Sequence, residues 1–156
     1  MRKSKDSQSP ITPGLVTAIA FTMLMAAPAA FAEEKAFIWT LDSDELEWGP
    51  CPEWMPEGCG IAVLQGDPTA ANADVLFRLP GNSTADHHWH SSAERMVLVA
   101  GEMSVDYDGQ DPVTLHPGTY AYGPAGLPHT AHCVSEESCL LFIAFEDPVD
   151  AHPVED

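Results

Sequence analysis

Hydrophobic residues beyond residue 60 recur in short runs of three to six positions, and turn residues end most of these runs. Glycine, proline, asparagine and aspartate favour the turns that join strands. The runs cover 61–64, 75–79, 96–100, 103–107, 113–115, 119–122, 129–133 and 140–145. No stretch after residue 33 carries the 3.6-residue apolar stripe of a surface helix. The pattern therefore predicts an all-β fold, an antiparallel sandwich or barrel over residues 61–146.

Two segments flank these predicted strands. Residues 33–60 are irregular, with three tryptophans among acids, prolines and two cysteines. We expect this segment to be an N-terminal arm whose tryptophans, Trp39, Trp48 and Trp54, anchor it to the core. Residues 147–156 are acidic and contain two prolines. We expect them to form a loose C-terminal tail.

The first 32 residues have the layout of a secretory signal peptide. Arg2, Lys3 and Lys5 form a basic start, and an uncharged apolar run follows over 14–27. Alanines 30 and 32 then offer small residues before a cut at Glu33. The alternative is an uncleaved N-terminal anchor, but the run falls short of the roughly 20 apolar residues that a membrane span needs. We expect a periplasmic or secreted protein with no stable membrane insertion after cleavage.

Charge excludes some partners. The chain has 6 Lys+Arg against 24 Asp+Glu, a formal net charge of -18. Such a chain repels polyanions, so we expect no nucleic-acid partner and no attraction to an anionic membrane surface.

The four cysteines, Cys51, Cys59, Cys133 and Cys139, form an even set. In an exported protein such a set is typical of disulfides, and three pairings are open. Local pairing, Cys51 with Cys59 and Cys133 with Cys139, would close two short loops. The alternative is a zinc site made of all four thiolates, but these sites favour tighter spacings such as C-x2-C.

A cluster of histidines carries the candidate chemistry. His88 and His90 are two residues apart, so on an extended strand they face the same side. Glu94 keeps that parity, and His129 begins another predicted strand 35 residues later. Imidazoles and a carboxylate from two strands suit one divalent transition metal ion: Zn, Cu, Fe, Mn or Ni.

At these positions the sequence resembles the cupin superfamily. The first family motif, G-x5-H-x-H-x3,4-E-x6-G, matches with one extra residue before the first histidine, at Gly81, His88, His90, Glu94 and Gly101. The second motif, G-x5-P-x-G-x2-H-x3-N, matches at Gly118, Pro124, Gly126 and His129, with Cys133 in place of the asparagine. We expect Gly81 and Gly101 to supply positive φ at turns.

The resemblance implies a cupin-type antiparallel β-barrel, a double-stranded β-helix or jelly roll, with the metal held by His88, His90, Glu94 and His129. It also implies a small-molecule ligand and dioxygenase, isomerase or lyase chemistry. The alternative is a non-catalytic module that binds or senses a metal or ligand. Because an open sheet edge invites pairing, we also expect a homodimer.

Three residues are candidates for catalysis. Glu94 could serve as a base as well as a ligand. Arg78 lies three residues before Gly81 and could neutralise a bound carboxylate if it faces inward, or else form an exterior ion pair. Tyr120 shares a strand face with Tyr122 and could present its hydroxyl to the cavity.

Overall fold

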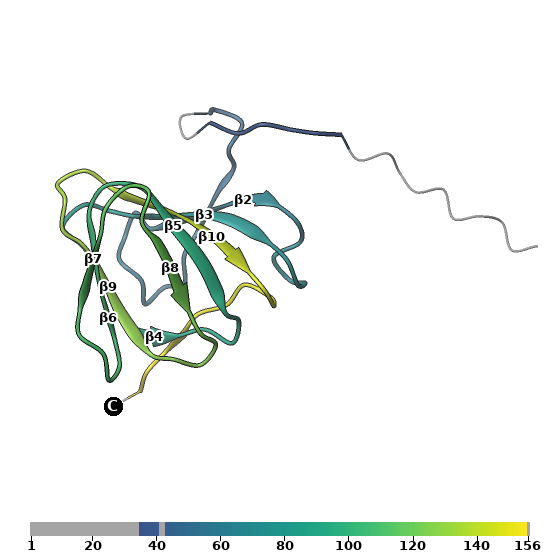
Figure 1. Cartoon of the computed structure of the whole chain (residues 1–156). Helices are drawn as coiled ribbons and strands as arrows, with labels where there is room; N and C mark the ends of the chain where they lie inside the picture. The colour runs from purple at the N-terminus through teal and green to yellow at the C-terminus, as the bar shows by residue number, and fades with distance from the viewer. Residues whose placement is uncertain (1–34, 41–42, 156) are drawn as a thin grey trace, which may run out of the picture. The chain divides into compact units, whose positions relative to one another are not determined.

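The computed structural model describes residues 35–40 and 43–155 (Figure 1). The expected signal peptide, residues 1–32, lies outside them. The described residues contain no helix and form eleven strands: β1 (Trp48–Pro50), β2 (Gly60–Gln65), β3 (Asp74–Leu79), β4 (Thr84–Trp89), β5 (Glu94–Ala100), β6 (Met103–Tyr107), β7 (Val113–Leu115), β8 (Tyr120–Gly123), β9 (His129–Cys133), β10 (Cys139–Phe145) and β11 (His152–Pro153). In this part of the chain, no helix has the length and apolarity needed to cross a membrane.

The strands form two antiparallel sheets that face each other. One sheet has the order β1-β2-β3-β10-β5-β8, and the other has the order β11-β4-β9-β6-β7. Figure 1 shows β6, β7 and β9 grouped on one side and β2, β3, β5 and β10 on the other. The predicted all-β, antiparallel fold is therefore confirmed.

Alternation of side chains places the core between the sheets. In β9 and β10 every second residue is buried and the others are half-buried. The buried side chains of this core come from both sheets, and they include Val75, Leu79, Leu98, Met103 and Ile143. Because a strand has a period of two, the apolar residues of one face meet those of the opposite sheet.

Strand β4 contains a bulge that explains the extra residue in the first motif. Ala85 lies opposite Ala131 of β9, and His88 lies opposite His129. Three residue steps on β4 therefore match two steps on β9. A bulge of this kind places one additional residue in a strand without moving its end. The inserted position keeps His88 beside His129 on the inner face.

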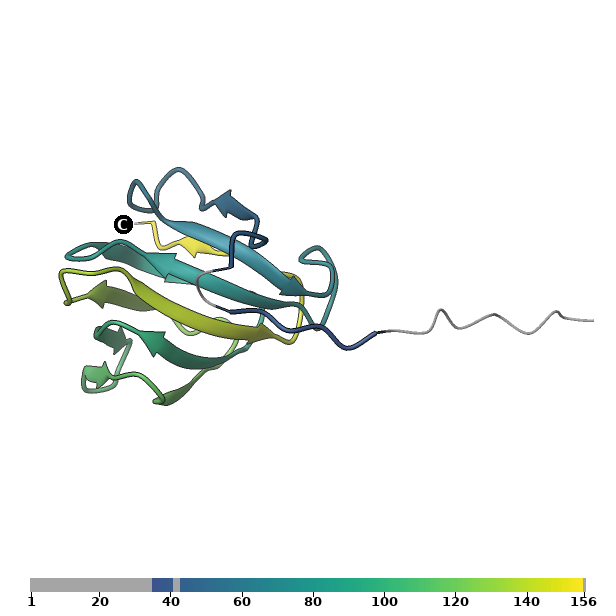
Figure 2. The same cartoon turned by 90° about the horizontal axis from the view of Figure 1, so that it is seen from above.

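The N-terminal arm covers the outer face of the first sheet. The indole N–H of Trp39 donates a 3.0 Å hydrogen bond to the carbonyl of Leu64. Leu46, Trp39 and Trp48 pack with Leu76 in a second, smaller apolar cluster. Figure 2 shows the arm running alongside the sheet. Burial of this outer face means that β3 is covered on both sides.

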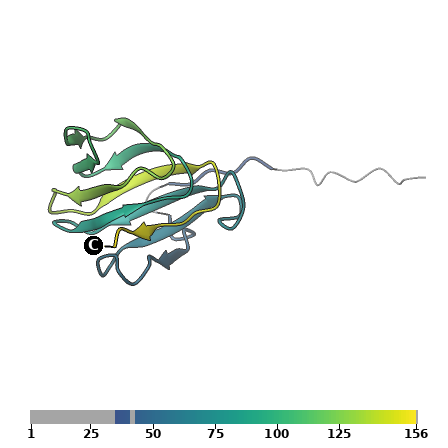
Figure 3. The same ribbon diagram turned by 90° about the horizontal axis from the view of Figure 1, so that it is seen from below.

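The C-terminal segment is ordered against the barrel, so the expectation of a loose tail is wrong. Strand β11 pairs with β4, and the ring of His152 stacks on Trp89 with centroids 4.3 Å apart. The backbone N–H of Val149 donates to the carbonyl of Pro68 over 2.9 Å. Figure 3 shows the end of the chain lying beside the sheet strands. Without β11, strand β4 would be the edge of its sheet, and its backbone groups pair with the C-terminal segment. The composition of that segment does not reveal this pairing.

Two motif glycines serve different purposes. Gly101 has a φ of 82°, as the turn prediction requires. Gly81 has no positive φ in this structure; instead, a Cβ there would lie 1.9 Å from the carbonyl oxygen of Glu136. The prediction for Gly81 is therefore corrected: a close approach of two backbone segments requires glycine.

The cysteines form the two local pairs. Cys51 bonds Cys59 and Cys133 bonds Cys139, with Cα–Cα distances of 5.6 and 5.7 Å. The first bond closes the loop between β1 and β2. The second joins β9 of one sheet to β10 of the other. Cys133, which replaces the asparagine of the second motif, thus ties the two sheets together.

Candidate metal centre

Three imidazole rings converge inside the barrel. His88 lies near the end of β4, His90 follows that strand, and His129 begins β9. Each ring offers one nitrogen, and these atoms lie within 4.8 Å of one another. The three residues are at most 9% exposed. This group could hold a metal ion.

Hydrogen bonds to backbone carbonyls set the tautomer of all three rings. The Nδ1 of His88 lies 2.6 Å from the carbonyl of Asp86, and the Nδ1 of His129 lies 3.3 Å from that of Leu127. The Nδ1 of His90 bonds the carbonyl of Asp150. A carbonyl only accepts, so each Nδ1 carries the hydrogen. Each Nε2 therefore presents a lone pair, which is the form that binds a metal.

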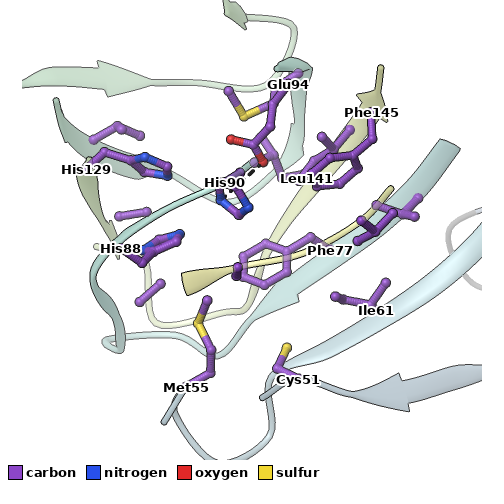
Figure 4. A pocket seen from close by; sticks show the side chains of 18 of the residues that line it. Cys51, Met55, Ile61, Phe77, His88, His90, Glu94, His129, Leu141 and Phe145 are labelled. Carbon is purple, nitrogen blue, oxygen red and sulfur yellow. Dashed lines mark ion pairs between the residues drawn. The ribbon is translucent and has the colours of Figure 1, made fainter. Parts of the chain in front are cut away.

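Glu94 completes the cluster from the opposite sheet. It begins β5, is 3% exposed, and places Oε1 3.5 Å from Nε2 of His90. Figure 4 shows its carboxyl group beside His90, with the three rings on the same side of the pocket. The structure thus brings the three histidines together and places Glu94 beside His90. That Glu94 is the fourth ligand stays a prediction.

Burial sets the charge of these groups. It is the main cause that lowers the pKa of His88, His90 and His129 to about 4 each. Burial also raises the pKa of Glu94 to about 8. The rings are therefore neutral near pH 7, and a cation beside Glu94 would stabilise its carboxylate. Three nitrogen lone pairs and one carboxylate suit a divalent transition metal.

The C-terminal segment supports His90. The backbone carbonyl of Asp150 accepts the hydrogen bond from that ring. Contacts of the Asp150 side chain hold the residue in place. The backbone N–H of Ser91 donates to Asp150 Oδ1 over 2.8 Å. His152 Nε2 lies 3.0 Å from Asp150 Oδ2. Sequence reasoning missed this contact because a backbone carbonyl leaves no trace in residue type.

A cavity of about 190 Å³ opens beside the four residues. Its walls come from both sheets and from the loop that Cys51 and Cys59 close. Most of the lining is aliphatic, aromatic or methionine, including Met55, Ile61, Phe77, Leu141 and Phe145. Figure 4 shows the histidines and Glu94 at one end, with Met55, Ile61 and Phe77 toward the other.

Two aromatic residues of the site were not among the predicted site residues. Tyr107 lines the cavity, with its ring centroid 5.1 Å from that of His129. Burial and the neighbouring Glu94 raise the pKa of Tyr107 to about 12, so the phenol keeps its proton. Trp54 lies 5.4 Å from the His88 ring. Parity within 103–107 could have placed Tyr107 inward, since Met103 and Val105 share its face.

Comparison with known proteins gives the family. The model of the ChrR cupin-like domain matches residues 38–148, which includes every strand from β1 to β10. The chain belongs to the ChrR cupin-like family. No curated protein matches the chain.

Solved structures show that the fold of this cupin is shared widely. The DMSP lyase DddQ from Ruegeria pomeroyi DSS-3 is 17% identical, with a TM-score of 0.60 over 70% of this chain and 61% of that one. An oxalate decarboxylase from Lactobacillus farciminis, in complex with formate, gives 14% identity and a TM-score of 0.57, over 70% and 33%. KdgF from Halomonas sp. gives 18% identity and a TM-score of 0.54, over 66% and 90%. This cupin therefore spans less than two thirds of the first two proteins.

Arg78 does not reach the cavity of this cupin. Its guanidinium carbon lies 4.3 Å from the centroid of the Trp48 ring, on the outer face of β3. Val75 and Phe77 of the same strand line the cavity, so the parity of Arg78 turns it outward. The inward orientation is therefore wrong. The side chain lies on the exterior, as the alternative had it, but its guanidinium stacks on an indole, and no ion pair of Arg78 is found among the described residues.

Tyr120 also points away from the cavity. It is 60% exposed and lies opposite Val97. The neighbouring pair, Met96 and Ala121, has its methionine in the cavity wall. Side chains alternate along β8, so Tyr120 and Tyr122 lie on the outer face. A role for the Tyr120 hydroxyl at the metal centre is excluded by this geometry.

Proposed function

We propose that this cupin is exported, binds one divalent transition metal ion through His88, His90, His129 and Glu94, and acts on a small organic molecule. One observation carries the proposal. Three Nε2 lone pairs and a buried carboxyl group meet at the polar end of an otherwise apolar cavity. Such a cavity, with few convergent polar groups, is typical of a small-molecule site.

A bound ion would supply Lewis-acid activation and a template for the substrate. Since an exported chain meets its metal outside the cytoplasm, the affinity order of divalent ions favours Cu or Zn over Fe or Mn. Metal analysis of protein purified from its native compartment tests this choice. Stoichiometric iron without zinc or copper would contradict it.

The chain's own residues would handle protons and exclude water. Glu94 can accept a proton once a cation lowers its pKa, which burial alone raises to about 8. The phenol of Tyr107 lies at the same end and keeps its proton, so it can donate a hydrogen bond. The apolar walls limit water at the reacting atoms. These roles suit dioxygenase, isomerase or lyase chemistry.

A second candidate function is ligand or metal capture without turnover. It is favoured by the small number of groups left for acid–base catalysis. With His88, His90, His129 and Glu94 counted as ligands, Tyr107 and Asp150 are the other titratable side chains among the described lining residues. The test is turnover by metal-loaded protein with phenolic, dicarbonyl and unsaturated acid compounds, followed by oxygen uptake and product analysis. Product formation that His129→Ala abolishes supports the enzyme. Saturable binding without product supports the capture module.

Export is supported by the two disulfides. Disulfides persist in the periplasm and outside the cell, and they are rare in reducing compartments. Fractionation of cells that express the full chain tests the proposal. A product that starts at Glu33 in the periplasm or medium is expected, and an uncleaved chain in the cytoplasm would contradict it.

A further inference from the structure

The cavity has two chemically different ends. The polar end holds the three rings and Glu94, whereas the other end is formed by Met55, Ile61, Phe77 and other apolar side chains (Figure 4). Its volume, about 190 Å³, is below the roughly 300–1,000 Å³ typical of drug-sized ligands. A molecule that fills this space must be small, and only one of its ends can meet polar groups.

The cationic side chains of the described residues lie elsewhere. Arg78 stacks on Trp48, outside the barrel. Arg95 pairs with Glu146 over 3.3 Å, and both side chains are 46% exposed. Lys35 is exposed in the N-terminal arm. None of the three lines the cavity, whose charged lining residues are Glu94 and Asp150.

This arrangement limits the charge of the ligand. An ion held by three neutral imidazoles and the Glu94 carboxylate leaves one net positive charge among these ligands, and the Asp150 carboxylate at that end is already bonded by the Ser91 N–H and His152. One anionic or strongly polar group can be compensated there. A second carboxylate would lie against apolar walls without a cation or donor, and burial of an unpaired charge is strongly unfavourable.

We propose that the ligand has one metal-binding head group with at most one negative charge, joined to an apolar body. This inference rests on the proposed metal centre and adds the substrate class. Dicarboxylates whose second carboxylate must lie among the apolar walls are excluded, whereas short-chain monocarboxylates and enolisable ketones are accepted.

The test uses the full chain loaded with Co(II), whose visible absorption reports on ligands at the metal. Hexanoate and adipate have the same number of carbons and differ by one carboxylate. Hexanoate is expected to bind at least a hundredfold more tightly, the order that an unpaired buried charge implies. Acetate, which lacks the apolar body, is expected to bind at least tenfold more weakly than hexanoate.

Three outcomes would overturn the inference: equal affinity for adipate and hexanoate, equal affinity for acetate and hexanoate, or no response to hexanoate from protein that holds one Co(II) per chain. These failures are distinct from failure of the metal centre. In that case the protein would take up no Co(II), and the visible spectrum would be absent.

A variant tests the cause of the selectivity. Met55 is half-buried at the apolar end, in the loop closed by Cys51 and Cys59. Met55→Lys places a cation there and is expected to raise adipate affinity at least tenfold, with Co(II) content unchanged. Met55→Gln is the matched neutral control and should not raise it. Equal adipate binding by both variants would show that the missing charge is not what excludes the second carboxylate.

Discussion

The Nδ1–H of His90 donates a hydrogen bond to the backbone carbonyl of Asp150, 60 residues further along the chain. This contact fixes which nitrogen of His90 faces the other rings. It also makes the C-terminal segment part of the metal centre, although the segment contributes no ligand atom. Partners of this kind orient ligands and tune their basicity.

Asp150→Ala should weaken metal binding. The substitution removes the acceptor for the Ser91 N–H and for His152, so the carbonyl that holds His90 loses its support. We expect Zn(II) or Co(II) affinity to fall about tenfold to a hundredfold, as measured by competition with a chelator. Asp147→Ala makes the same charge change at an exposed position of the same segment and should leave affinity unchanged. An equal loss of metal affinity in both variants would show that the Asp150 side chain does not support the ligand His90.

His88→Ala or His129→Ala should remove the bound metal. Each variant deletes one of three converging nitrogen ligands, while the β-sheet circular dichroism spectrum should remain. Metal content per chain, measured by elemental analysis, is expected to fall from one to near zero. His132→Ala is the control, since His132 lies on the same strand and bonds Thr84 over 2.9 Å instead. Full metal content in both ligand variants would contradict the assignment.

The stability of the metal-free protein should peak at about pH 7. The pKa of each of the three histidines is about 4 in the folded protein, against the ordinary value of 6.5 that holds in the unfolded chain. Between these two values the unfolded chain binds more protons, so stability rises with pH. Glu94 has the opposite sign, because its pKa is about 8 when folded against 4.5. By pH 7 to 8 the unfolded chain has lost most of its histidine protons, so the Glu94 effect exceeds the histidine effect. The free energy of unfolding should then fall by about 0.5 kcal/mol between pH 7 and pH 8.

Glu94→Gln isolates that effect. The variant has no carboxyl group to deprotonate, so urea unfolding at pH 7, 7.5 and 8 should show no decline, unlike the parent chain. Loading the parent with metal should also remove the decline, because a cation favours the carboxylate at every pH in this range. An identical decline in both metal-free proteins would show that Glu94 does not titrate in this window.

Each disulfide should contribute about 2 kcal/mol to stability, since both close short loops. Unfolding of Cys51→Ser/Cys59→Ser and of Cys133→Ser/Cys139→Ser by urea measures the two contributions separately. Each variant keeps one disulfide, so reducing agent should lower its free energy of unfolding by the contribution of that remaining bond. Four titratable thiols in the native protein, with no effect of reductant, would refute both bonds.

Much of the barrel follows from alternation and turns. The runs at 103–107, 113–115 and 129–133 coincide with β6, β7 and β9, because each has one buried face and ends at turn residues. The histidine-bearing strand β4 is polar, so only the family motif marked it. Its bulge was visible as one surplus residue in that motif, but its position depends on pairing with β9.

The orientation of Arg78 and the role of the C-terminal segment could not be predicted. Val75 and Leu76 are both buried, at 1% and 2% exposure, because the arm covers the outer face of β3. With both faces buried, composition does not tell which one meets the cavity. Asp150 acts through its carbonyl, which every residue possesses.

The disulfide between Cys133 and Cys139 holds the two sheets together at one end of β9. It joins the sheets at the last residue of β9 and the first of β10, whereas His129 and Phe145 stand at the far ends of those strands. Four residue steps along β9 separate His129 from Cys133, a distance of about 13 Å. An ion bound by Glu94 of β5 and by the histidines would join the two sheets a second time, at the opposite end of β9.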